Sequence, residues 1–273
     1  MMTLFYFSWH IYAIGSLIAI LLVWCIILTY YKSHYLRRRY LYNDRETCLL
    51  GKEKALLLGV IYAEQIHCYV NSLTTGLKKH KLDEILYNHW EVTDRETALC
   101  KLDWLLTSGD RMRYVDIYPF ISQKEGDFKY AEYLDLNNHF LDNNELDVRM
   151  CMIDNLSEIT KEMSTHIAFS FSPENMKRGV ASWDAVRLVV LARICFDKGY
   201  ITEQQAWNFI SDAYDLAYVN YKNWKEVATG YIIGHSMYDW GDNESLDKII
   251  NLAEEAISNK ESPWMNIDFK LIS

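Results

Sequence analysis

Residues 182–199 read SWDAVRLVVLARICFDKG, and this stretch decides the expected fold. Ser182 is a residue type that caps helices, Asp184 would lie in the first turn, and Gly199 would end the helix. The apolar residues between them recur at helical spacing: Ala185, Leu188, Val189, Leu191, Ala192 and Ile194. The stretch therefore predicts a helix with a strong apolar face.

The same pattern of cap, apolar face and stop recurs along the rest of the chain. Downstream, Thr202 with Gln205 is a capping-box signal, and Asn223 and Ser245 can each cap a further helix. The expected downstream helices cover 202–217, 224 to about 240, and 245 to about 257. Upstream, a long helix is expected over 49–73 that closes near Gly76, and a second from the capping box of Thr93 and Glu96 to Gly109. A loop or short extended piece follows at 113–121. Further helices are expected near 127–141 and 144–168, before a break at 172–179.

The composition supports a helical class. Half of the residues are hydrophobic, which argues against disorder. Only 13 glycine and proline residues occur among the 229 residues from Arg45 onward, which is sparse for an all-β fold. We therefore expect an all-α protein, with an N-terminal transmembrane helix followed by a single multi-helix globular domain.

The formal net charge of −9 is unevenly distributed. Residues 1–31 contain no Asp, Glu, Lys or Arg, and four basic residues follow: Lys32, Arg37, Arg38 and Arg39. Without these four, 24 basic residues stand against all 37 acidic ones, so the body carries a charge near −13. Because binding to phosphates depends on Lys and Arg, a body this acidic is a poor general nucleic-acid binder.

Residues 4–31 have the features of a membrane anchor. Only His10 in this stretch could carry charge, and the inner part, 11–28, reads IYAIGSLIAILLVWCIIL. About 20 apolar residues cross a bilayer core, and aromatic residues crowd both ends, as in a membrane-spanning helix. A cleaved signal peptide would need a charged start, a shorter apolar core and a small-residue cleavage site, none of which is present.

The basic residues after the span predict its orientation. By the positive-inside rule they place the C-terminal body in the cytoplasm. The expected domains are an anchor at 1–31, a basic juxtamembrane collar at 32–44 and a helical cytoplasmic domain at 45–273. Gly15 and Ala19 form one small-xxx-small step, which gives weak support to a homodimer. The six cysteines are scattered and are expected to be reduced thiols.

No motif in the sequence predicts a metal or cofactor site. Glu64 and His67 form a single ExxH step, whereas a di-metal bundle needs two such steps. There is no HExxH, no Cys/His zinc spacing, no P-loop and no GxGxxG. The acidic stretch at 135–147 lacks the ligand and glycine positions of a calcium loop. We therefore expect neither a metal nor a cofactor.

Two interpretations remain open for the polar residues of the helix at 182–199. Asp184 and Arg187 are neighbours on a helix and could line a polar pocket with Trp183. They could equally form a structural pair at a helix end, which is the commoner role for such pairs and the one we favour. Gly234-His235-Ser236 lies inside an expected helix and lacks the second glycine of a nucleophile elbow, so a serine hydrolase is not indicated.

A set of tryptophan, glycine and charged positions carries a family resemblance. These positions are Trp90-x-Val92, Leu102-Asp103-Trp104-Leu105, Gly109-x-Arg111, Trp183-Asp184-x-x-Arg187, Arg193, Gly199-Tyr200-Ile201, Ala206-Trp207, Trp224, Gly230-x-x-x-Gly234 and Trp240. Over about 88–241 the chain resembles the YbeU/YbeR-like bacterial domain of unknown function, number twelve-sixty-six. The resemblance implies an α-helical bacterial domain and no established reaction. The candidate pocket or structural signature comprises Trp183, Asp184, Arg187, Arg193, Trp207 and His235.

Three functions follow as hypotheses. The leading one is an acidic, helical protein-binding module anchored at the bacterial inner membrane, in one form an immunity-type protein that neutralises a basic toxin. The second is an enzyme with a polar pocket around Asp184, Arg187 and His235, which must converge on one solvent-reachable hollow. The third is a membrane-associated scaffold that dimerises through its anchor.

Overall fold

The computed structural model describes residues 20–25, 40–45, 51–121, 133, 142–238 and 243–271. Contacts divide the chain into two compact units, Met1–Arg39 and Tyr40–Ser273. The second unit consists of helices and connecting loops, with no strand among its described residues. The all-α class predicted from the cap and apolar spacing is thus confirmed.

The described elements follow one another through short connections. In chain order they are the 3-10 helix η1 (Gly51–Gly59), α2 (Val60–Ile66), α3 (Lys79–Glu84), the π-helix η2 (Ile85–His89), α4 (Arg95–Thr107), α5 (Gly109–Ile121), α7 (Asn143–Met163), α8 (Pro173–Arg178), α9 (Ala181–Asp197), α10 (Glu203–Asn220), α11 (Trp224–Ser236), α12 (Asn243–Ser258), α13 (Pro263–Asn266) and the 3-10 turn η3 (Phe269–Leu271).

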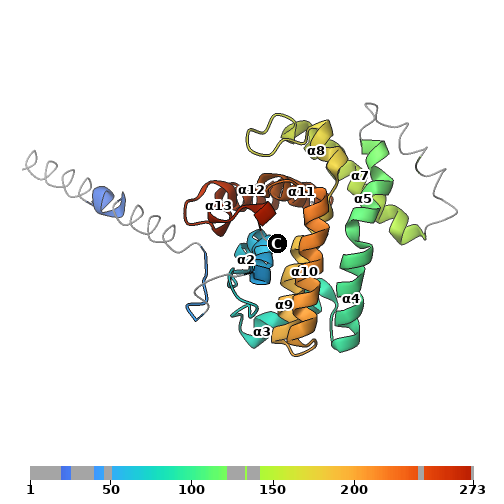
Figure 1. Ribbon diagram of the computed structural model, residues 1–273. Coiled ribbons are helices and arrows are strands. Elements are labelled where there is room, and N and C mark those ends of the chain that lie inside the picture. The colour runs from blue at the N-terminus through green and yellow to red at the C-terminus, as the bar shows by residue number, and fades with distance from the viewer. Residues whose placement is uncertain are drawn as a thin grey trace, which may run out of the picture. The chain divides into compact units, whose positions relative to one another are not determined.

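Helix α9 is the centre of the second unit. It is buried on every side from Ala181 to Ile194 except at Arg187, and it contacts α4, α5, α10, α11, α2 and η1. Figure 1 shows α9 and α10 side by side. A helix that is hydrophobic all round belongs inside a domain. The stretch singled out by the sequence is therefore the core helix around which the others pack.

The long helix expected over 49–73 is wrong. The chain forms η1 and α2 instead, and α2 ends at His67 in the left-handed region. Residues 68–78 then form a loop whose carbonyl groups are bound by Arg193. Local apolar spacing favours a helix, but hydrogen bonds from the distant, buried side chain of Arg193 satisfy backbone carbonyls of a loop instead.

The loop or extended piece expected at 113–121 is also wrong, because these residues complete α5 with Pro119 inside it. Proline removes one helical hydrogen bond, the one that the carbonyl of Val115 would accept. Val115 and Pro119 both lie on the exposed side of α5. A carbonyl on that side can turn to water, so the helix tolerates the proline.

Some of the predicted helix caps are confirmed, and others differ from the structure. The capping box of Thr202 with Gln205 and the cap at Asn223 are confirmed. The cap of α4 is Asp94 with Thr97, one residue after the predicted Thr93. Ser182 does not cap α9: the helix begins at Ala181, and the N–H of Ser182 donates to the hydroxyl of Tyr221.

Further boundaries shift by a few residues. The predicted helix near 144–168 is α7, and the predicted break at 172–179 contains the short helix α8, capped by Ser172. Helix α12 begins at Asn243, before the predicted cap at Ser245. The helix expected near 127–141 lies, apart from Tyr133, outside the described residues.

The expected anchor lies mostly outside the described residues as well. Within it, residues 20–25 form a helical turn with exposed side chains. Across the parts of the chain that the structure describes, no helix has both the length and the apolar character needed to cross a bilayer. The collar residues Lys32, Arg37, Arg38 and Arg39 also lie outside the described residues.

Candidate functional site

Asp184 in α9 caps the N-terminus of α5. Its Oδ1 accepts the backbone N–H of Asp110 at 2.9 Å, and its Oδ2 accepts the N–H of Arg111 at 3.0 Å. First-turn N–H groups have no partner inside their own helix, and a carboxylate beside them is also favoured by the helix dipole. Gly109 makes the approach possible, since its φ is +59° and a Cβ there would lie 2.1 Å from Oδ2 of Asp184.

Arg187 joins two buried carboxylates. Its Nη2 donates to Oδ2 of Asp110 at 2.7 Å and to Oδ1 of Asp184 at 2.8 Å, while its Nε donates to the carbonyl of Trp183 at 3.0 Å. Its guanidinium carbon lies 4.1 Å from the ring centre of Trp183 and 5.5 Å from that of Trp90. A planar guanidinium between carboxylates and aromatic faces is a geometry that lysine cannot reproduce.

Asp110 is surrounded by donors in the same way. Besides Arg187, its carboxylate accepts the indole N–H of Trp183 at 3.1 Å, the hydroxyl of Tyr238 at 2.6 Å and Nη1 of Arg113 at 3.0 Å. Asp184 completes its own set with Nη1 of Arg111 at 2.9 Å. Each carboxylate thus accepts four hydrogen bonds, two on each oxygen, which fills its acceptor positions.

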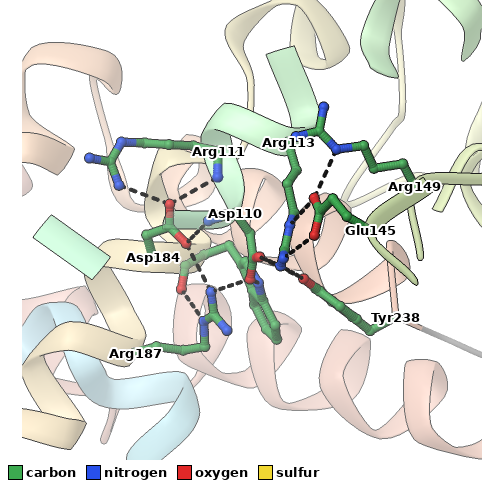
Figure 2. A network of polar contacts seen from close by, with 9 residues as sticks. Asp110, Arg111, Arg113, Glu145, Arg149, Asp184, Arg187 and Tyr238 are labelled. Carbon is green, nitrogen blue, oxygen red and sulfur yellow. Dashed lines mark hydrogen bonds and ion pairs between the residues drawn. The ribbon is translucent and has the colours of Figure 1, made fainter. Parts of the chain in front are cut away.

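The network continues from α5 to α7 through Glu145 (Figure 2). Arg113 donates to the two oxygens of Glu145 from Nε at 2.9 Å and from Nη2 at 2.7 Å, a bidentate pair. Arg149 donates to Glu145 at 2.8 Å and to Asp116 at 2.5 Å. Four arginines and four carboxylates therefore alternate in one chain of ion pairs. Starting at Arg111, the chain runs through Asp184, Arg187, Asp110, Arg113, Glu145 and Arg149, and it ends at the surface with Asp116.

The pKa values of the two core carboxylates shift in opposite directions. Burial raises the pKa of Asp184 above its ordinary value, and the Arg187 charge and the backbone N–H groups offset this only in part. Burial also opposes ionisation of Asp110, but the charge of Arg187 and the hydrogen bond from Tyr238 outweigh it and hold the pKa of Asp110 below its ordinary value. Asp184 is 0% exposed and Asp110 is 1% exposed.

The structure brings four of the six predicted residues together. Trp183, Asp184 and Arg187 meet in the network, and the ring of His235 stands edge-on to that of Trp183 with the centres 5.7 Å apart. Arg193 is elsewhere, buried against the loop at 68–78. Trp207 lies half-buried one turn into α10, where its indole N–H donates to Glu203 at 3.4 Å.

His235 packs against Trp183, beside the hydrogen-bond network. Its Nδ1 is buried without a hydrogen-bond partner. Burial lowers the pKa of His235 to about 4, and the nearby Arg187 charge acts in the same direction. The neutral imidazole therefore packs against Trp183 as part of the core.

Two glycines of α11 let it approach α9 closely. A Cβ at Gly234 would lie 2.3 Å from Cβ of Trp183, and one at Gly230 would lie 2.6 Å from Oγ of Ser182 and 2.4 Å from the hydroxyl of Tyr221. Such distances leave no room for a side chain. The two glycines are four residues apart and thus lie on one face of α11, the face that packs closely against α9.

The sequence reasoning missed most of the network's partners. Asp110, Arg113, Glu145, Arg149 and Tyr238 were not singled out. Two signals were available: Asp110 is the middle residue of Gly109-x-Arg111, and Glu145 with Arg149 is a helical pair spaced by four. Asp110 with Arg113 is likewise a local pair, spaced by three, whereas the pairings of Arg113 with Glu145 and of Tyr238 with Asp110 join residues far apart in the chain, which local spacing cannot reveal.

The predicted enzyme pocket required Asp184, Arg187 and His235 to converge on a solvent-reachable hollow. Instead, Asp184 is sealed beneath the first turn of α5, and its acceptor positions are filled by protein donors. In the described residues, no group of three His, Cys, Asp or Glu side chains is placed to hold a metal ion. What the arrangement can do is lock α5, α7, α9 and the segment after α11 to one another.

Comparisons with known proteins place this network in one family region. The model of a family described as "Protein of unknown function (DUF1266)" matches residues 85–269, a longer stretch than the predicted 88–241. That region contains the whole network from Asp110 to Tyr238. No curated protein matches the chain, and no solved structure matches it.

Proposed function

The chain belongs to the DUF1266 family, whose description states no function, and we propose its function from its own site and surface. It is a protein-binding module without catalytic activity, which takes a basic protein partner. An immunity-type protein that neutralises a toxin is its most concrete form. The finer assignment to a YbeU/YbeR-like subgroup stays a prediction.

One observation carries the proposal: the acceptor positions of Asp110 and Asp184 are filled by protein donors. A catalytic carboxylate needs a free oxygen within reach of its substrate. A carboxylate with four donors can only hold those donors in place. The strongest polar cluster of the described chain therefore supports a rigid scaffold rather than a reaction centre.

The surface supports the choice of a basic partner. Among the described arginines, only Arg45 and Arg95 are exposed, and the others are buried or half-buried. Helix α10 contains no Lys or Arg, and α7 presents acidic residues at a spacing of seven, four and four, which are Asp147, Asp154, Glu158 and Glu162. An acidic face of this kind attracts a basic protein and speeds its association.

The test combines toxin protection with a pair of charge reversals. We expect cells that carry the gene beside a cognate toxin gene to survive, and the full chain to capture a basic protein whose binding weakens as salt rises. Changing Asp154→Lys with Glu158→Lys on α7 should abolish capture. Changing Glu96→Lys with Asp103→Lys on α4, a matched change of two exposed carboxylates, should leave it unchanged. No protection together with no salt-sensitive partner would overturn the proposal.

We further propose that residues 4–31 anchor this module in the bacterial inner membrane, with the body in the cytoplasm. The support is the 28-residue stretch without Asp, Glu, Lys or Arg, followed by Lys32, Arg37, Arg38 and Arg39. We expect the protein to stay with membranes after alkaline carbonate washing, and the body to be digested only when protease reaches the cytoplasmic side. Release by carbonate would contradict the anchor and leave the binding proposal standing.

A scaffold that dimerises through its anchor remains the third candidate. Crosslinking of Gly15→Leu against the unaltered chain would test it, because a leucine at the small-xxx-small step would keep two anchors apart.

A further inference from the structure

A surface cavity of about 500 Å³ lies where the segment before the family region meets the end of α9. Residues between Thr74 and Leu82 form one wall, and Asp197 and Lys198 form the other. The volume falls within the range of small-molecule sites. The cavity shares none of its lining residues with the buried network around Asp184.

The wall of the cavity is fixed by two residues of α9, one helical turn apart. Arg193 is 0% exposed and donates to the carbonyls of Tyr69 and Thr74, while Asp197 accepts the backbone N–H of Thr75 at 2.7 Å and also its hydroxyl. Within the loop, the N–H of Tyr69 donates to the carbonyl of Thr75 at 2.9 Å. The loop is therefore held in one conformation before any ligand arrives, which lowers the cost of binding.

A glycine completes the wall. Gly76 has a φ of +73°, and a Cβ there would lie 2.3 Å from Cε2 of Tyr69. The backbone at Gly76 can pass beneath that ring only without a side chain. The loop returns at this point toward Leu77 and Lys79, both of which line the cavity.

Two lysines, Lys79 and Lys198, line the cavity together with one carboxylate, Asp197. Lys79 belongs to the basic run KKHK at 78–81, on a chain whose net charge is −9. Lys198, on the wall formed by α9, is paired with Asp83, and its side chain is 15% exposed. Lys79 is exposed and forms no ion pair with any described residue, so its ammonium group is available to an anion.

Two apolar residues, Leu77 and Leu82, also line the cavity. Lysine ammonium groups bind phosphate as point charges, and apolar walls suit the organic part of a ligand. We propose that this cavity binds an organic phosphate, held by Lys79 beside the Lys198–Asp83 ion pair and against the wall that Arg193 and Asp197 fix. The same chemistry is offered by a soluble phosphate ester and by the headgroup of an anionic lipid.

The experiment measures how fast single lysines are acylated in the full chain, kept in a neutral detergent. Glycerol 3-phosphate is the soluble probe, with glycerol as its uncharged match. Micelles doped with short-chain phosphatidylglycerol are the lipid probe, with phosphatidylcholine as the match. Lys260, exposed and outside the cavity, is the internal control.

We expect one phosphate probe to slow acylation of Lys79 about tenfold relative to Lys260, and its uncharged or zwitterionic match to leave both rates unchanged. By calorimetry, Lys79→Gln should weaken binding of that probe about tenfold, whereas Lys260→Gln should not. Protection by glycerol 3-phosphate identifies a soluble ester, and protection by phosphatidylglycerol alone identifies a lipid headgroup. Equal acylation of Lys79 and Lys260 with both probes, or unchanged affinity in Lys79→Gln, would overturn the proposal without touching the protein-binding function.

Discussion

Asp184 accepts the backbone N–H of Asp110 at 2.9 Å, so a carboxylate in α9 caps a helix that begins about 74 residues earlier in the chain. Arg187, one turn further along α9, forms an ion pair with both carboxylates. A buried charge is tolerated only when it is paired and hydrogen-bonded. Because the cap comes from a different helix, it fixes the position of α5 relative to α9.

Replacing Asp184 by asparagine should strongly destabilise the protein. The amide keeps the shape but turns a donor toward the N–H groups of α5 and leaves Arg187 and Arg111 short of a charge. Breaking a buried pair in this way costs about 3–5 kcal/mol. Urea unfolding of the full chain, followed by tryptophan fluorescence, measures it. The matched control Asp103→Asn, on the exposed face of α4, should change stability by less than about 0.5 kcal/mol. A loss no larger than the control's would show that the pair is not structural.

Replacing Gly234 by alanine should push α11 away from α9. The added Cβ would meet Trp183 at 2.3 Å, and overpacking of this kind costs about 1–3 kcal/mol. Because the indole N–H of Trp183 donates to Asp110, the shift should also change tryptophan emission in the folded state. Gly199→Ala is the comparison: its φ is +78° but no atom lies within 4 Å, so it should cost about 1 kcal/mol from backbone strain alone and leave emission unchanged. Equal emission spectra for the two variants would contradict the close contact.

Replacing Arg193 by methionine should free the loop at 68–78. The carbonyls of Tyr69 and Thr74 would lose their buried donor, and each unsatisfied group costs about 1–3 kcal/mol. Hydrogen exchange at the amide of Tyr69, which now donates to Thr75, should accelerate by a factor that matches this loss. Arg193→Lys should not restore protection, because one ammonium cannot reproduce the planar fork. Unchanged exchange in both variants would mean that the loop holds its shape without Arg193.

Stability should fall as the pH drops from 7 to 5, in part through His235. Its pKa is about 4 in the folded state against 6.5 in the unfolded state, so only the unfolded chain binds this proton in that range. The stability that the neutral ring contributes is complete above pH 6.5 and is lost as the pH falls toward 4, with about 2 kcal/mol gone by pH 5.

The difference between the unaltered chain and His235→Gln isolates this effect from the titration of other groups. Urea unfolding at several pH values should show a smaller slope between pH 5 and 6.5 for His235→Gln. The matched variant His80→Gln, at an exposed position, should keep the original slope. Identical slopes for all three proteins would mean that His235 is not buried in its neutral form.

The sequence alone determined the helical class and the helices that are encoded locally. Thr202 with Gln205 begins α10, Asn223 begins α11, and the apolar run after Ser182 is the buried helix α9. These features are readable because a cap binds N–H groups two or three residues away, and because the apolar face of a helix repeats within one turn.

Only the tertiary structure decided the loop after α2, the continuation of α5 through Pro119, and the partners of Asp184. For the loop and for Asp184 the stabilising contact comes from far along the chain: Arg193 reaches the carbonyl of Tyr69 across 124 positions, and Asp184 reaches the N–H of Arg111 across 73. For α5 it is the exposure of the helix side at Pro119, set by packing, that allows the proline. The sequence named Asp184 and Arg187 but left their role open, because the energy of a buried charge depends on which groups surround it. That environment exists only once α5, α9 and α11 have packed together.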